Sequence, residues 1–293
     1  MVYDKPDILF ILLPIVYHIC LCPFLNKKYL TDNLMKNLSN TGRIFYGISI
    51  AAIGLLTIYY KDFPYMIIPP HSRIPGFTII AFISGLLFML AGACIVFGKS
   101  TRQVSLLLGR VLLLIFCFYF VPYEFIATST YMHLGEWENA EKEWALAGGA
   151  FVIAGCFSGN NEKLFFSFLG KLIPFGAIFF SITMISFGIL HFLFAKEAST
   201  LVPAWIPGHM FWIYFAGIAL IGSGIGIILK IKSALNAFLL GSMIFLWFIM
   251  LHIPRVIAAP VADRGDEIAS AFLALAYSGI AFVIAGTTTI KNK

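Results

Sequence analysis

Two histidines, an arginine and a glutamate carry most of the chemistry that the apolar segments of this sequence could perform. His191, His252 and Arg255 lie within residues 174–260, and Glu124 lies in an earlier apolar segment. An ionisable side chain inside a membrane-spanning segment is energetically costly, so it faces protein or water rather than lipid. Imidazole groups can hydrogen-bond a ligand and transfer protons near neutral pH. We therefore predict a site in which His191 and His252 are the catalytic residues.

Other interpretations of these histidines stay open. Each could be a neutral imidazole that bonds a neighbouring carbonyl group and has a structural role only. Two histidines at similar depth could also ligate a haem between helices. A haem site usually has small residues opposite the histidines, and the sequence does not identify such residues here. The cofactor therefore stays unknown, and a quinone is favoured over a haem. The missing C-x-x-C-H motif excludes a covalent c-type haem, and no spacing of Cys, His, Asp and Glu predicts a metal site.

Four further residues are expected to bind the ligand: Glu124, Arg255, Trp205 and Tyr123. Arg255 aligns with Tyr123, next to Glu124, in the internal repeat described below, so an ion pair between Glu124 and Arg255 could close the site. Both charged groups could instead reach water at the membrane surface. Trp205 lies in an aromatic cluster typical of a membrane interface, and the cluster could equally roof a pocket.

The composition predicts a helical membrane protein. Hydrophobic residues make up 60% of the 293 residues, charged residues make up 12%, and the mean hydropathy is +0.92. Soluble domains average about 25% charged residues. Apolar runs long enough to cross a hydrocarbon core recur along the chain, whereas the alternating strands of a membrane barrel do not. The net charge of +6 is spread over short loops, so we expect contact with the lipid bilayer and none with nucleic acid.

The apolar runs predict eight spans in two sets. The first set lies near 44–60, 77–97, 105–126 and 145–158, and the second near 172–194, 211–230, 235–257 and 267–288. Residues 8–25 add an uncleaved helix that either spans the membrane or lies at its surface, and the polar residues 26–43 are expected to form a linker. Residues 134–144 (LGEWENAEKEW) predict an exposed amphipathic turn whose glutamates lie in water.

Glycine and proline positions indicate that the second set of spans repeats the first. Pro207-Gly208, Gly217, Gly241 and Pro254 lie 132 residues after Pro75-Gly76, Gly85, Gly109 and Pro122. Because these residue types restrict or permit particular backbone geometries, their coincidence predicts a repeated backbone. An even number of spans in each copy gives both copies the same orientation. The expected fold class is therefore all-α and polytopic, with an N-terminal unit at 1–42 and two parallel four-helix repeats at 43–158 and 172–288.

The charged loops predict how the protein sits in the membrane. The segments 26–43, 98–104, 159–171 and 230–234 and the C-terminus are basic, whereas 61–76, 127–144, 195–210 and 258–266 carry most of the acidic residues. Basic loops stay in the cytoplasm. We expect a multi-pass protein of the cell inner membrane with a cytoplasmic C-terminus, which places His191 and His252 near the outer leaflet.

The motifs GILHF (188–192) and VPAWIPG (202–208), followed by a glycine-rich span from Gly217 to Gly226, resemble the DoxX-like membrane proteins. The resemblance implies a four-helix unit and a bacterial component of a membrane oxidoreductase, and it assigns a role to His191 alone. It covers the second repeat well. In the first repeat Thr57 and Phe120 stand where the second has His191 and His252.

These observations favour a component of a quinone-linked membrane redox system, with its site between the repeats near the outer leaflet. A non-catalytic subunit or scaffold for membrane or periplasmic protein partners is one alternative. A transporter or lipid-handling protein that uses the same cleft is another. The sequence leaves open whether the protein catalyses a reaction.

Overall fold

The computed structural model describes residues 27–68, 76–127, 132–157 and 164–291. Within these ranges the chain forms helices and no β-strand. Seven of the described helices are long and apolar enough to cross a membrane. The predicted all-α, polytopic membrane fold is therefore confirmed. The helix expected at 8–25 lies outside the described residues.

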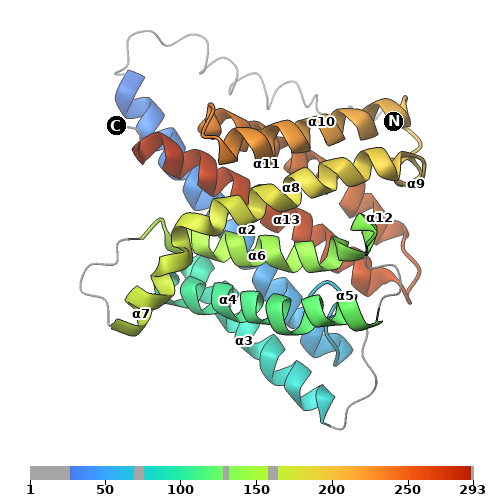
Figure 1. Ribbon diagram of the computed structural model, residues 1–293, viewed down its shortest axis with the longest axis horizontal. Helices are drawn as coiled ribbons and strands as arrows, with labels where there is room; N and C mark the ends of the chain where they lie inside the picture. Colours follow the sequence, from blue (N-terminus) through green and yellow to red (C-terminus); the bar gives the residue numbers. More distant parts are fainter. Residues whose placement is uncertain (1–26, 69–75, 128–131, 158–163, 292–293) are drawn as a thin grey trace, which may run out of the picture.

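The two halves of the chain contribute similar sets of helices (Figure 1). The first half forms α2 (Lys27–Tyr60), α3 (Phe77–Phe97), α4 (Thr101–Ile115), α5 (Val121–Ala127) and α6 (Glu138–Ala154). The second half forms α8 (Gly176–Leu193), α10 (His209–Ile228), α11 (Ser233–Trp247), α12 (Ile253–Ala258) and α13 (Arg264–Lys291). Two short helices, α7 (Leu164–Leu169) and α9 (Ala195–Ser199), lie in the connections.

Two segments differ from the sequence predictions. From Lys27 onward the stretch expected to be a linker forms the first turns of α2. The acidic segment 134–144 forms a short 3-10 helix, η2 (Leu134–Trp137), and then the first turns of α6. With 17 residues, α6 is about 25 Å long and is shorter than the seven candidate spans. Most of its residues are buried, so protein rather than lipid surrounds much of this helix.

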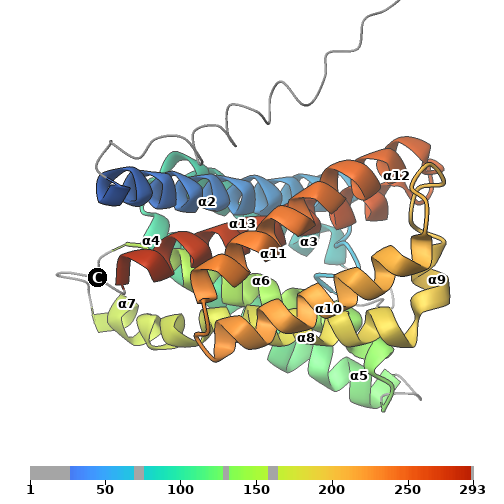
Figure 2. The same cartoon turned by 90° about the horizontal axis from the view of Figure 1, so that it is seen from above.

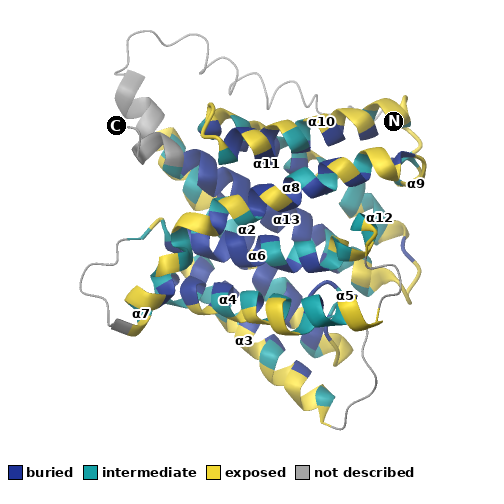
Figure 3. Cartoon of the chain, viewed as in Figure 1, coloured by how far each residue is buried: buried dark blue, intermediate teal, exposed yellow. Residues whose placement is uncertain are grey.

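The centre of the bundle is formed by α13 and α6. In the most apolar part of α13, 83% of the residues are buried, compared with 17–44% in the other six candidate spans. Figure 3 shows the buried residues concentrated along these two helices, with exposed residues on the outer helices. Exposed Ile, Leu and Phe side chains along α3 are what a helix in contact with lipid requires. The membrane-facing surface and the protein core therefore belong to different helices.

The loops of opposite charge lie at opposite ends of the bundle. In Figures 1 and 2, α7 and the last turns of α13 lie at one end, and α5, α9 and α12 lie at the other. The first end carries the basic connections, and the second carries the acidic ones. The predicted orientation assumed that the basic and acidic connections lie at opposite ends of the bundle, and they do. The assignment of the basic end to the cytoplasm stays a prediction.

A five-residue π-helical turn interrupts the third helix of each half. The turn η1 (Phe116–Phe120) joins α4 to α5, and η4 (Phe248–His252) joins α11 to α12. Pro122 and Pro254 each follow two residues after a turn. A proline has no N–H group, and its ring clashes with the carbonyl four residues earlier, so the turn before it widens.

Other backbone features recur at the same spacing. The residues with positive φ at the second and third helix starts are Gly76, Gly98 and Ser100 in the first half and Gly208, Lys230 and Lys232 in the second, which are 132 residues apart in each case. The helices α2 and α13 approach most closely where Gly42 meets Gly279, and α8 and α6 do so where Gly176 meets Gly148. The superposition of 43–158 on 172–288 stays a prediction, and these features support it.

Candidate functional site

A cavity of about 710 Å³ lies in the second half of the chain, among α8, α10, η4 and α13. Its volume is within the range of about 300–1,000 Å³ that is typical of small-molecule sites. The interior is mainly apolar and includes Met184, Phe187, Leu220, Met243, Leu273 and Ala274. The charged lining residues come from the end of the bundle that carries the acidic loops; they are Glu138, Lys142, Glu197 and Arg255. An apolar interior with a charged mouth suits a molecule that has a polar head and an apolar body.

Both predicted catalytic histidines line this cavity. His191 comes from the last turn of α8, and His252 is the last residue of η4. The structure thus brings together two residues that are 61 positions apart in sequence. Most of the wall belongs to the second half, and the first half contributes Tyr65, Glu138 and Lys142. The catalytic roles of His191 and His252 stay predictions.

The hydrogen bond of His191 determines its tautomer. Its Nδ1 lies 2.7 Å from the carbonyl oxygen of Phe187, one turn earlier in α8. A carbonyl oxygen can only accept, so Nδ1 carries the proton and donates it. In the neutral ring Nε2 is then an acceptor. His191 is therefore arranged to receive a hydrogen bond from a hydroxyl group in the cavity.

His252 reaches the wall through the π-helical turn. The N–H group of Ile253 bonds to the carbonyl of Phe248, five residues earlier, which widens the helix at this point. The Nδ1 atom of His252 is buried and has no hydrogen-bond partner among the described residues. Single π-helical turns are frequent at functional sites, and a buried polar atom without a bond calls for an explanation.

The expected ion pair between Glu124 and Arg255 is wrong. Arg255 instead pairs with Glu267 in the first turn of α13, with 2.5 Å between Nη2 and Oε1. Only the residues 259–263 separate α12 from α13, so this partner is held close by the chain itself. Glu124 is buried on α5, and Figures 1 and 2 show α5 and α12 on different sides of the bundle.

Three of the four predicted ligand-binding residues lie away from this cavity. Arg255 lines it, whereas Glu124, Tyr123 and Trp205 are not among its lining residues. Trp205 is 65% exposed, in keeping with the interfacial interpretation. The aromatic residues that do line the cavity include Trp212 and Trp247, whose ring centroids lie 6.2 Å apart.

Three positions of the first half that correspond to the cavity wall hold packed side chains. The positions 132 residues before Leu220, Ile244 and His252 hold Phe88, Leu112 and Phe120, which are all buried. Phe88 and Phe120 are larger than the residues that they match.

Glu143 is an acidic residue whose position the sequence analysis misjudged. It was expected in a solvated turn, but it lies inside α6 and is fully buried. The helical spacing contained the signal, because Glu143 precedes Leu146, Ala147 and Ala150 by three, four and seven residues and so shares their face. Those three residues are fully buried.

No group of three or more His, Cys, Asp or Glu side chains that could hold a metal ion occurs in the part of the chain that the structure describes. No family model, curated protein or solved structure matches this chain. The likeness to the DoxX-like proteins therefore rests on the motifs between residues 188 and 226. What the structure itself establishes is a multi-helix membrane protein with one histidine-lined cavity among its described residues.

Proposed function

We propose that this protein binds a lipid-soluble quinone in the cavity and serves as a component of a membrane redox system. The observation that carries the proposal is the pair His191 and His252 on the wall of one apolar cavity of about 710 Å³. A quinone has a flat head with two oxygen atoms and an apolar tail. The polar atoms of the mouth suit the head, and the apolar interior suits the tail.

The two histidines would hold the head of the ligand. Nε2 of His191 is the acceptor in the neutral ring, so it suits the hydroxyl group of a reduced quinone. His252 has a ring nitrogen without a bond among the described residues, so it can hydrogen-bond the second oxygen. Proton release from a quinol to these imidazoles requires a separate acceptor for its electrons, which a protein partner in the membrane or periplasm would supply.

The proposed setting follows from the charge distribution and from the resemblance to the DoxX-like proteins. Basic connections at one end favour the bacterial inner membrane with a cytoplasmic C-terminus. The mouth of the cavity would then lie near the outer leaflet. The residues 43–158 and 172–288 would form two parallel repeats, of which the second holds the ligand.

A second candidate is a lipid-handling protein, and it is favoured by Lys142 and Arg255 in the cavity lining. Two cationic groups near an apolar pocket could bind the anionic head of a lipid. The two functions predict different ligands in the same cavity, so one measurement separates them.

The test is to purify the protein in a mild detergent, extract its bound lipids and identify them by mass spectrometry. A quinone supports the redox proposal, an enriched anionic lipid supports the alternative, and an empty protein that co-purifies with other chains supports a scaffold. An absorption spectrum of the same sample detects a haem.

A titration with a short-chain ubiquinone then locates the site. Quinones quench tryptophan fluorescence at short range, so quenching should fall when Trp212 and Trp247 are both replaced by Phe. Trp205→Phe is the matched control, because Trp205 lies outside the cavity lining, and it should leave saturable quenching in place. His252→Phe should weaken binding while the protein stays folded, since Phe120 holds the corresponding position in the first half. Saturable quenching that survives the double Trp variant and His252→Phe would place the ligand elsewhere.

A further inference from the structure

Glu143 is the most unusual polar group of the bundle. Its exposed fraction is 0%, and neither carboxyl oxygen has a hydrogen-bond partner within the part of the chain that the structure describes. It lies on α6, which packs against α4, α8 and α13. Buried carboxyl groups are normally paired or hydrogen-bonded, so an isolated one calls for a functional explanation.

Burial without a partner determines the form of this carboxyl group. A carboxylate transferred from water to an apolar interior loses its hydration, and here no cation or donor replaces it. In such surroundings the group takes up a proton and becomes neutral. We therefore expect the carboxyl group of Glu143 to be protonated.

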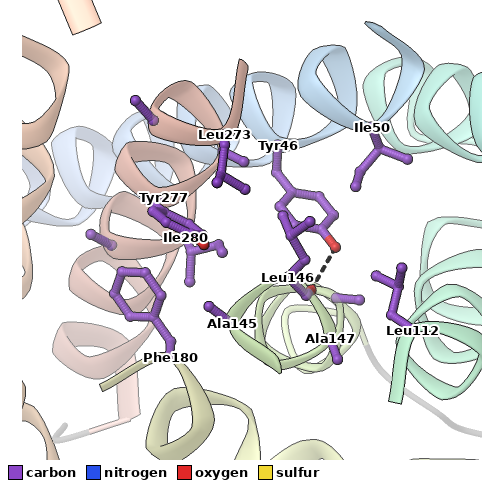
Figure 4. Close-up of a cluster of buried hydrophobic side chains, with 14 of the residues drawn as sticks. Tyr46, Ile50, Leu112, Ala145, Leu146, Ala147, Phe180, Leu273, Tyr277 and Ile280 are labelled. Atoms are coloured by element: carbon purple, nitrogen blue, oxygen red, sulfur yellow. Dashed lines mark hydrogen bonds between the residues drawn. The ribbon is translucent and has the colours of Figure 1, made fainter. Parts of the chain in front are cut away.

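Two tyrosines flank this acid. Tyr46 of α2 donates its hydroxyl hydrogen to the carbonyl of Leu146 at 2.8 Å, and Tyr277 of α13 donates to the carbonyl of Lys142 at 3.3 Å. Figure 4 shows both tyrosines directed toward α6 from neighbouring helices. The two carbonyl groups that they bond belong to the residues three after and one before Glu143 in α6.

The two tyrosines differ in one respect. Tyr277 lines the cavity, whereas Tyr46 is not among the lining residues. Tyr277 therefore borders the cavity and also bonds the carbonyl of Lys142, the residue before Glu143 in α6. A tyrosine hydroxyl can accept one proton while it donates another, so it can pass a proton in either direction.

We propose that Glu143 is a proton-binding site in the interior of the protein, and that it exchanges its proton with the cavity through the hydroxyl group of Tyr277. In this exchange the hydroxyl group of Tyr277 turns from the carbonyl of Lys142. Its oxygen accepts the proton of Glu143 while its own proton passes to a water molecule in the cavity, which leaves a carboxylate on Glu143. The reverse transfer restores the acid. No electron moves in this exchange. The proton site rests on the surroundings of Glu143, and its use by a quinone rests on the proposed function.

The groups around Glu143 allow this exchange. Tyr46 faces it from α2 and Tyr277 from α13, and α6 itself carries Glu138, Glu141 and Lys142 on the preceding turn. Lys142 forms its ion pair with Glu138 at 2.6 Å. From α4 and α8, no titratable side chain of the described residues interacts with Glu143. The acid is therefore not neutralised by a fixed positive charge.

Infrared spectroscopy of the purified full-length protein tests the proton site. In a Glu141→Gln background, which removes a second carboxyl group whose pKa burial raises to about 7, the protein at neutral pH should show the C=O stretch of a protonated carboxylic acid. Adding Glu143→Gln should remove this band. Glu138→Gln, which removes an exposed carboxyl group, is the matched control and should keep the band. A band that keeps its full intensity when Glu143→Gln is added to the Glu141→Gln background would overturn the proposal.

A chemical probe covers the case in which Glu143→Gln does not fold. Dicyclohexylcarbodiimide is apolar and activates protonated carboxyl groups, so it should modify Glu143 of the wild-type protein at neutral pH, as read by peptide mass spectrometry. Modification of the exposed Glu138 with Glu143 unmodified would contradict the proposal.

The route is tested by transfer into D₂O, in which the carboxyl band shifts as deuterium replaces the proton. Tyr277→Phe should slow this shift by on the order of 10²-fold, the lower end of the effect of a positioned proton-transfer group. Tyr46→Phe also removes a tyrosine hydroxyl group, but Tyr46 does not line the cavity. In this variant the carboxyl proton should exchange at the wild-type rate. Equal rates in all three proteins would exclude the route through Tyr277.

These measurements use no quinone, so they are independent of the proposed function. If the band and its exchange behave as expected but no quinone binds, the proton site stands and the ligand assignment fails. If quinone binds and Glu143→Gln keeps the carboxyl band, the ligand assignment stands and the proton site fails.

Discussion

Arg255 and Glu267 form an ion pair with 2.5 Å between Nη2 and Oε1, and the pair ties the end of the third helix in the second half to the first turn of α13. Arg255 also lines the cavity, so the pair stabilises part of its mouth. The second carboxyl oxygen of Glu267 is buried without a hydrogen-bond partner. Glu267 therefore depends on Arg255 as its partner among the described residues.

Removing one member of this pair should destabilise the protein. Arg255→Gln leaves the carboxylate of Glu267 partly buried and unpaired, and we expect a loss of about 1–3 kcal/mol in the free energy of unfolding. Arg255→Gln combined with Glu267→Gln should lose less than the sum of the single changes. Unfolding in mixed detergent measures these losses. Glu138→Gln removes the exposed partner of Lys142, which keeps its hydrogen bond to Asn139. It should lose only about 0.3–0.5 kcal/mol, the value of a pair four residues apart in a helix; an equal loss in all variants would contradict this reasoning.

The two proline-associated π-helical turns should differ in their effect on ligand binding. Pro254→Ala allows a regular helix and should rotate His252 by about 100°, the turn of one residue. We therefore expect weaker saturable quenching by the short-chain ubiquinone. Pro122→Ala makes the same change in the first half, where Phe120 is packed, and should leave quenching unchanged. Equal loss in both variants would show that the effect is on folding.

Two glycines provide a test of helix packing. A Cβ atom at Gly148 would lie 2.7 Å from the carbonyl oxygen of Gly176, whereas one at Gly222 would meet nothing within 4 Å. Gly148→Ala must push α6 away from α8 and should cost about 1–3 kcal/mol of unfolding free energy. Gly222→Ala should be neutral or stabilise the protein by about 0.5–1 kcal/mol, because alanine favours a helix. Thermal unfolding in detergent compares the two, and similar midpoints would refute the close contact.

The orientation can be tested in intact cells. In a cysteine-free background, Lys196→Cys lies at the acidic end and should react with a membrane-impermeant thiol reagent. Lys99→Cys and Lys232→Cys lie at the basic end and should react only after the membrane is opened. All three side chains are exposed, so access alone decides the result. Labelling of the two basic-end positions in intact cells would reverse the proposed orientation.

The sequence located the helices well because span length and apolarity are local properties. The predicted span 77–97 is the observed α3, and Pro122 and Pro254 mark the two π-helical turns. The start of α6 was misjudged, since four glutamates in eight residues are typical of a solvated turn. Only the packing of neighbouring helices against α6 makes one of them a buried residue.

The sequence by itself determined the class of the protein, the order of its helices and the residues whose chemistry is costly in a membrane. Apolar length and the backbone limits of glycine and proline act within a few residues, so they can be read along the chain. The tertiary structure decided that His191 and His252 share a cavity, that Arg255 pairs with Glu267 rather than Glu124, and that Glu143 is buried. Each of these depends on which helix faces lie together. Which helix faces meet depends on the volumes of side chains that are far apart in the sequence and on how closely their helices approach. Patterns within a few residues of the chain do not specify these contacts.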